Sequence, residues 1–157
     1  MLTLLLALAC TGSVETDTDT GDEDVAGTGT LALSFRIDDD YRDVMQEPAL
    51  GPFWGSVYLA DEVTGIGPDD GALPLAHIHV AEIDLTGEPV SAALFVTDPL
   101  PNDWVTILGF MDSDSNAVPG DEDPDSKDPV TLPNENEFLV VKDAETPAEV
   151  FFGFLNP

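Results

Sequence analysis

A chain of 157 residues, 43% of them hydrophobic, is long enough for one domain with a sizeable core. Its charge is unusual, because only four Lys and Arg residues are set against 32 Asp and Glu residues, for a net charge of −28. This charge excludes nucleic acids and anionic membrane surfaces as electrostatic partners, since phosphate binding needs clustered Lys and Arg, and it favours divalent cations, basic proteins or concentrated salt.

The chain begins with a short apolar segment, MLTLLLALA, directly before Cys10, the only cysteine. The segment is too short to span a bilayer, which needs about 20 apolar residues, but it has the length of a signal-peptide core, about 7–15 residues. The stretch Ala7-Leu8-Ala9-Cys10 resembles a bacterial lipobox, although Ala7 stands where Leu is usual. The resemblance implies a signal peptide over residues 1–9 and a lipidated Cys10. An ordinary cleaved secretory signal is the alternative.

Residues 10–29 are rich in Thr, Asp and Gly and contain few apolar side chains. Such a segment cannot bury enough apolar surface to offset the entropy lost on ordering, so we expect a disordered, self-repelling tether. Together with the lipobox, it predicts a membrane-anchored lipoprotein of the cell envelope, on the periplasmic or the cell-surface face.

From residue 30 onward, short apolar stretches are separated by Pro, Gly, Asp and Asn. The stretch LALSFRI alternates apolar and polar residues, as a half-buried strand does. We predict strands over residues 31–37, 54–60, 76–85, 90–96, 104–111, 137–141 and 149–155. Three other segments are predicted to be irregular: at most one helical turn within 41–47, and loops over 47–55 and 64–74. The pattern predicts one antiparallel β-sandwich of about seven strands over residues 30–157, with a small closed β-barrel as the alternative.

The segment GFMDSDSNAVPGDEDPDSKDP, residues 109–129, follows an apolar strand and concentrates acidic side chains in one loop. Residues with side-chain oxygens suited to a metal stand at every second position at first, and further acidic residues follow after a Pro-Gly turn. Ca²⁺ takes six to eight oxygen ligands, so the spacing predicts a structural calcium site. The predicted ligands are Asp112, Asp114, Asn116, Asp121 and Asp123. A solvated acidic surface, as in a salt-adapted protein, is the alternative.

The predicted calcium site is not an EF-hand, because Ala117 and Asp123 occupy positions where an EF-hand has Gly and Glu. Instead, residues 99–124 resemble the strand and acidic loop of prealbumin-like (transthyretin-like) β-sandwich modules in bacterial surface lipoproteins. The matching positions are Phe110, Asp112, Asp114, Asn116, Gly120, Asp121 and Pro124. The resemblance implies an all-β extracytoplasmic module and carries no activity.

Both histidines lie in AHIHV, where a strand would place His77 and His79 on one face, about 7 Å apart. A His-x-His pair is half of many Zn²⁺ or Cu²⁺ sites, so these residues form an alternative metal site. The apolar positions change face between Ile78 and Ile83. A bulge or a strand end near Ala81 would correct this change and leave the histidines outward, where they are more often structural or incidental than metal ligands.

The sequence contains no catalytic motif: no Ser stands in G-x-S-x-G, and the Gly-rich segments lack the Lys of a phosphate-binding loop. We therefore predict a protein that is not an enzyme. The preferred function is a lipid-anchored extracytoplasmic module that binds calcium structurally and serves surface or periplasmic interaction. The alternative function is a periplasmic Cu- or Zn-binding protein that uses His77 and His79.

Overall fold

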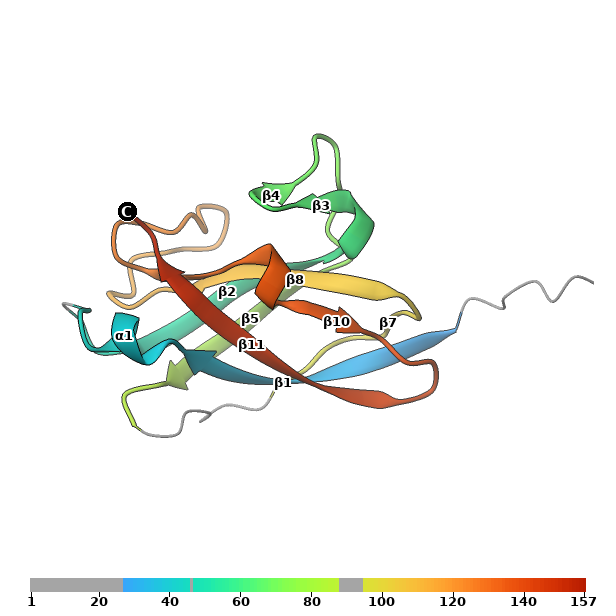
Figure 1. Ribbon diagram of the computed structural model, residues 1–157, viewed down its shortest axis with the longest axis horizontal. Coiled ribbons are helices and arrows are strands. Elements are labelled where there is room, and N and C mark those ends of the chain that lie inside the picture. Colours follow the sequence, from blue (N-terminus) through green and yellow to red (C-terminus); the bar gives the residue numbers. More distant parts are fainter. Residues whose placement is uncertain (1–26, 46, 88–94) are drawn as a thin grey trace, which may run out of the picture.

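The computed structural model describes residues 27–45, 47–87 and 95–157. The signal peptide predicted over residues 1–9, Cys10 and most of the predicted tether lie outside the described residues. The described part is all-β, as predicted, with a nine-stranded sheet and a small two-stranded sheet (Figure 1). The strands of the large sheet are β1 (Thr28–Ile37), β2 (Leu50–Leu59), β5 (Ala76–Asp84), β6 (Phe95–Val96), β7 (Leu100–Pro101), β8 (Trp104–Met111), β9 (Pro129–Thr131), β10 (Glu137–Leu139) and β11 (Glu145–Leu155).

Strands β3 (Val63–Thr64) and β4 (Gly67–Pro68) form the small sheet, and the short helix α1 (Asp39–Arg42) follows β1. The large sheet has the order β5-β2-β8-β9-β11-β1-β6, with β10 also paired to β8 and β7 also paired to β1. It folds into two layers, so that β1 and β11 cross over β2 and β5, as expected for a sandwich (Figure 1). One pair departs from the antiparallel pattern, because the first strand, β1, runs parallel to the last, β11.

The core lies between the two layers. The alternation in β1 is confirmed, since Leu31, Leu33, Phe35 and Ile37 are all buried. Phe35 lies 5.0 Å from Phe53 of β2 and 6.4 Å from Phe152 of β11, measured between ring centroids. The three rings therefore join both layers through tilted and stacked contacts, which add specific geometry to the burial of apolar surface.

Two glycines make room for the ring of Phe53. Gly55 of β2 pairs directly with Gly109 of β8. A Cβ atom on Gly55 would lie 2.6 Å from the Phe53 ring, and one on Gly109 would lie 2.4 Å from the carbonyl oxygen of Trp54. Larger residues at these positions would clash with the ring or the backbone, so this close approach requires glycine.

The loop prediction for residues 47–55 was wrong, because β2 begins at Leu50. Pro52 is tolerated within β2 because the pairing with β5 shifts there, between Gly51 and Phe53. Over the same stretch β5 advances from Val80 to Ile83, one residue more than β2. Of the two options expected near Ala81, a bulge and a strand end, the structure shows the bulge, which explains how the apolar positions of β5 change face.

The remaining predicted elements agree in part. The strand predicted over 104–111 coincides with β8, whereas the helical turn expected within 41–47 begins earlier, as α1. Its N-cap is Asp38, whose carboxylate accepts a hydrogen bond from the backbone N–H of Asp40. Residues 90–94 of the predicted strand 90–96 lie outside the described residues.

Candidate functional site

The acidic loop, residues 112–128, joins β8 to β9 and is anchored at both ends by a buried aspartate. At the first end, Asp112 Oδ1 accepts a hydrogen bond from the backbone N–H of Asn116 at 3.1 Å. Its Oδ2 accepts one from the N–H of Ala117 at 3.0 Å. Asp112 thus holds the first turn of the loop, in the manner of aspartates that bond the backbone a few residues ahead.

At the other end, Asp128 fixes both halves of the loop. Its Oδ1 accepts hydrogen bonds from the N–H and the hydroxyl of Ser113, each at 3.1 Å, and its Oδ2 accepts one from the N–H of Asp125 at 3.1 Å. Burial raises the pKa of Asp128, and these hydrogen bonds oppose part of that shift. The end of the loop is therefore tied back to its beginning.

Between these anchors, Asn116 lies between two carboxylates. Its Nδ2 group donates to Asp114 Oδ2 at 3.0 Å and also to Asp125 Oδ2. Desolvation, followed by repulsion from the carboxylates of Asp125 and Asp112, raises the pKa of Asp114. The ion pairs among the described residues, Arg36–Glu149 and Arg42–Asp39, lie outside this loop. The convergent carboxylates thus form no salt bridge with a described Lys or Arg side chain, although Lys127 belongs to the same loop.

The loop also borders a small polar cavity of about 190 Å³. Its lining combines the segment after α1 with both halves of the loop. The lining residues are Met45, Glu47, Ser113, Asp114, Asp125, Ser126, Lys127 and Asp128. Four of these residues carry a carboxylate, which is the ligand type that Ca²⁺ prefers.

The five calcium ligands predicted from the sequence are not all brought together in this way. Asp112, Asp114 and Asn116 are joined by the contacts described above, whereas Asp121 belongs to a turn in which its N–H donates to the carbonyl of Val118. Asp123 lines a different, larger depression. Within the described ranges, no group of three or more His, Cys, Asp and Glu side chains is arranged to hold a metal ion.

Sequence reasoning missed Asp125 and Asp128 as members of this cluster. Both stand in the acidic run and share its composition, but the hydrogen bonds that connect them to Ser113 and Asn116 close the loop over nine to fifteen residues. Such a closure depends on the path of the loop, which the spacing of its acids does not reveal.

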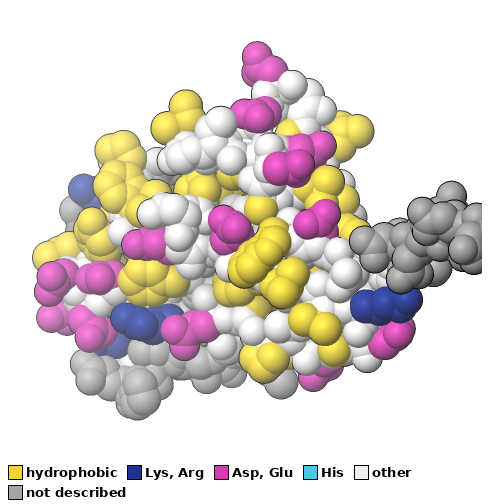
Figure 2. Space-filling view, turned by 45° about the vertical axis from the view of Figure 1, so that its right-hand side comes forward, with side chains coloured by type: hydrophobic (Ala, Val, Ile, Leu, Met, Phe, Trp, Pro, Cys, Tyr) yellow, Lys and Arg dark blue, Asp and Glu magenta, His cyan; other side chains and the backbone are white. Residues whose placement is uncertain are grey.

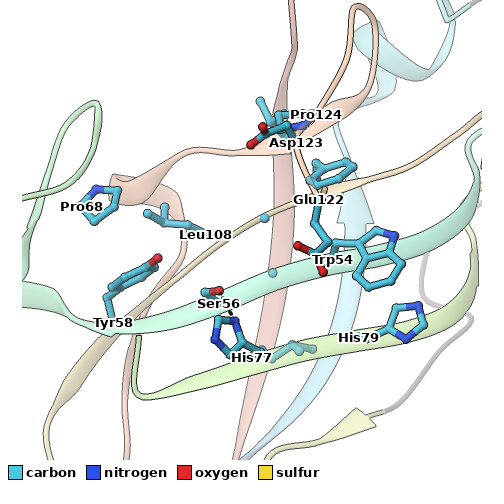
Figure 3. Close-up of a pocket in the computed structure, with 15 residues that line it drawn as sticks. Trp54, Ser56, Tyr58, Pro68, His77, His79, Leu108, Glu122, Asp123 and Pro124 are labelled. Carbon is cyan, nitrogen blue, oxygen red and sulfur yellow. Dashed lines mark hydrogen bonds between the residues drawn. The ribbon is translucent and has the colours of Figure 1, made fainter. Parts of the chain in front are cut away.

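The larger depression, here called the groove, has a volume of about 760 Å³ and lies on the outward face of β2, β5 and β8 (Figure 3). Three groups of side chains line it: aromatic and polar residues of β2, the two histidines of β5, and part of the acidic loop that projects over the sheet. The labelled members are Trp54, Ser56, Tyr58, Pro68, His77, His79, Leu108, Glu122, Asp123 and Pro124.

The histidines are exposed on one face of β5, as predicted, and each contacts the residue opposite on β2. His79 stacks on Trp54, with ring centroids 3.9 Å apart and an angle of 20° between the planes. His77 Nδ1 lies 3.0 Å from the hydroxyl of Ser56 (Figure 3). These contacts hold both rings at the groove, where each imidazole already has a partner on β2.

Trp54 carries an unusual feature, since its indole Nε1 is buried and makes no hydrogen bond with a described residue. A buried N–H donor without an acceptor costs about 1–3 kcal/mol. Tryptophan at this position is therefore not explained by stability alone.

The surface outside the groove reflects the composition of the chain. On the face in Figure 2, Asp and Glu side chains are spread over the surface, Lys and Arg are few, and apolar side chains are exposed between them. Among the described residues, no helix is long and apolar enough to cross a membrane. Comparison with protein-family models, with curated proteins and with solved structures finds no match for this chain.

Proposed function

We propose that this chain is a lipid-anchored extracytoplasmic β-sandwich module that serves surface or periplasmic interaction and binds Ca²⁺ structurally in its acidic loop. The observation that carries the calcium part is the position of the Asn116 amide between the carboxylates of Asp114 and Asp125. The Nδ2 donor occupies the place between two carboxylate oxygens that a cation would take.

The chemistry of the three side chains suits an exchange of this amide donor for a calcium ion. Turning the Asn116 amide by 180° would present its oxygen, a ligand type that Ca²⁺ accepts, in place of its N–H groups. The ion would then be bound by Asp114, Asn116 and Asp125, with backbone carbonyls or water completing the six to eight ligands. This set replaces Asp112, Asp121 and Asp123 of the sequence prediction with Asp125, since both oxygens of Asp112 already accept backbone hydrogen bonds.

The proposal requires the loop to tighten around the ion, because the described side chains do not form a metal-holding group. Binding would then be linked to the ordering of the loop. An ion bound only by the native state, at 100 times its Kd, adds about 2.7 kcal/mol of stability. Desolvation, and then repulsion from Asp125 and Asp112, raises the pKa of Asp114. A bound ion would relieve this repulsion, which supports such a linkage.

Calorimetric titration of the full chain with CaCl₂ tests the loop assignment. Asp114→Asn should abolish the binding heat, whereas Glu137→Gln should retain it, because Glu137 is an exposed acid of β10 that lies outside the acidic loop. Equal calcium binding by both variants would contradict the assignment.

The lipid anchor rests on the sequence alone, through Ala7-Leu8-Ala9-Cys10. Expression in a bacterial host with a radiolabelled fatty acid should label the wild-type chain in the membrane fraction and leave Cys10→Ser unlabelled. A labelled Cys10→Ser variant, or a secreted wild-type chain without label, would contradict the anchor while leaving the calcium proposal intact.

A further inference from the structure

The groove combines aromatic surface with negative charge. Trp54 and Tyr58 of β2 present rings to it, and Glu122 and Asp123 reach it from the acidic loop (Figure 3). The described residues that line it include no Lys or Arg. An anionic ligand would therefore meet carboxylates without a compensating cation, whereas a purely apolar ligand would leave Glu122 and Asp123 without a role.

A cation with a flat, weakly hydrated surface fits both properties. The guanidinium group of arginine stacks on aromatic faces and forms paired hydrogen bonds with carboxylates, and it loses hydration more easily than the ammonium of lysine. The net charge of −28 would attract a basic partner from a distance.

The same chain contains an intramolecular example of this recognition. The guanidinium carbon of Arg36 lies 4.9 Å above the ring of Phe151, and Arg36 Nη1 lies 3.7 Å from a carboxylate oxygen of Glu149. An aromatic ring and a carboxylate thus hold one arginine on the outer face of the β1–β11 pair. The groove offers the same two groups with no described arginine between them.

We infer that the groove is a docking site for arginine side chains of a basic segment in a partner protein. Trp54 and Tyr58, four residues apart on β2, would each offer a ring to one guanidinium, and Glu122 and Asp123 would supply the carboxylates. The volume of about 760 Å³ lies within the range of about 300–1,000 Å³ typical of ligand sites, and it leaves room for residues beside the arginine. The inference names a partner class for the proposed interaction role and rests on that role, but not on calcium binding.

A titration with paired peptides tests the inference. The full chain is titrated calorimetrically, at physiological salt, with a capped Gly-rich hexapeptide that contains two arginines and with the same peptide carrying citrulline, which keeps the shape but has no charge. The arginine peptide should bind at least tenfold more tightly than the citrulline peptide. Equal affinity for the two peptides would overturn the inference. The inference would also be overturned if the protein bound a neutral oligosaccharide but did not bind the arginine peptide.

Matched variants separate the groove from general attraction to an acidic protein. Glu122→Gln/Asp123→Asn should weaken binding about tenfold or more, whereas Asp61→Asn/Glu62→Gln, an adjacent acidic pair outside the groove lining, should weaken it less than twofold. Trp54→Phe should weaken binding about two- to fivefold, since Trp gives the strongest cation–π contact. Equal losses in the two double variants would show attraction by net charge alone and contradict the site.

The proposed calcium function and this inference fail separately. Calcium stabilisation of the Glu122→Gln/Asp123→Asn variant is expected to persist, because the proposed ligands Asp114, Asn116 and Asp125 are unchanged. Loss of calcium binding in Asp114→Asn with retained peptide binding would leave the groove assignment standing.

Discussion

Trp54 and His79 lie opposite each other on β2 and β5 and stack with ring centroids 3.9 Å apart. We predict that His79→Ala lowers the free energy of unfolding by about 0.5–1 kcal/mol, because cross-strand aromatic pairs contribute that much to a sheet. His77→Ala should cost less, since His77 loses mainly its contact with the hydroxyl of Ser56 and no stacked ring. Urea unfolding of both variants measures the difference, and a larger loss in His77→Ala would contradict this view of the stack.

Replacing Trp54 by phenylalanine removes the buried indole N–H that has no described acceptor. The variant keeps an aromatic ring beside His79, so we expect its stability to be unchanged or higher by up to about 1 kcal/mol. Chemical denaturation provides the measurement. A loss of more than about 2 kcal/mol would show that the indole N–H, or the full size of the ring, contributes to stability after all.

Asn136 is a buried side chain that links the segment before β10 to β11. Its Nδ2 donates to the carbonyls of Leu132 and Phe151, and its Oδ1 accepts from the N–H of Phe151 at 2.7 Å. Asn136→Ala should therefore destabilise the fold by about 2–4 kcal/mol, because it leaves partly buried backbone groups of Leu132 and Phe151 without these partners. Asn134→Ala, at an exposed position of the short 3-10 turn (Pro133–Glu135) that precedes Asn136, is the control and should change stability little. Similar losses in both would argue against the side-chain bridge.

The raised pKa values of Asp114 and Asp128 give a pH dependence with a definite sign. In the unfolded chain these carboxyls titrate near the ordinary value of 3.8, so between that value and the raised pKa the folded state binds more protons. Their contribution to stability is therefore greatest at or below pH 3.8 and falls as the pH rises through this window.

Asp114→Asn should remove part of the stability that the fold loses as the pH rises. In EDTA, the variant should therefore gain stability relative to wild type between pH 3.5 and pH 7. Asp61→Asn, which removes the same charge from an exposed position outside the loop, controls for the general relief of repulsion and should gain less. A pH series of thermal unfolding curves makes the comparison. An equal gain in the two variants would contradict the proposed repulsion within the loop.

The sequence predicted what depends on local pattern. The nearly continuous apolar run of β8 determined its limits, and the change of face between Ile78 and Ile83 indicated an irregularity near Ala81, which in the structure is a bulge of β5. The start of β2 was missed because Gly51 and Pro52 normally exclude a strand, and only the pairing with β5 and β8 shows how they are accommodated. Non-local pairing also explains why the parallel contact of β1 with β11 was not predicted.

The candidate sites follow the same division. The outward placement of His77 and His79 followed from alternation along one strand, and the structure agrees. The cluster of Asp114, Asn116 and Asp125, and the approach of Glu122 and Asp123 to the sheet, depend on how the loop folds back over β8. No spacing rule encodes that path, because two buried aspartates at its ends determine it through hydrogen bonds to the backbone.

The central claim, a specific calcium site in the acidic loop, is tested most directly by thermal unfolding of the full chain after EDTA treatment. Melting curves are recorded in millimolar CaCl₂, in equal MgCl₂ and in molar KCl, for wild type, Asp114→Asn and Glu137→Gln. We predict that Ca²⁺ raises the Tm of wild type and Glu137→Gln well beyond the effect of Mg²⁺, and that Asp114→Asn loses this difference. Stabilisation by molar KCl alone, or an equal response to Ca²⁺ in all three proteins, would contradict the claim and make the loop a salt-adapted surface.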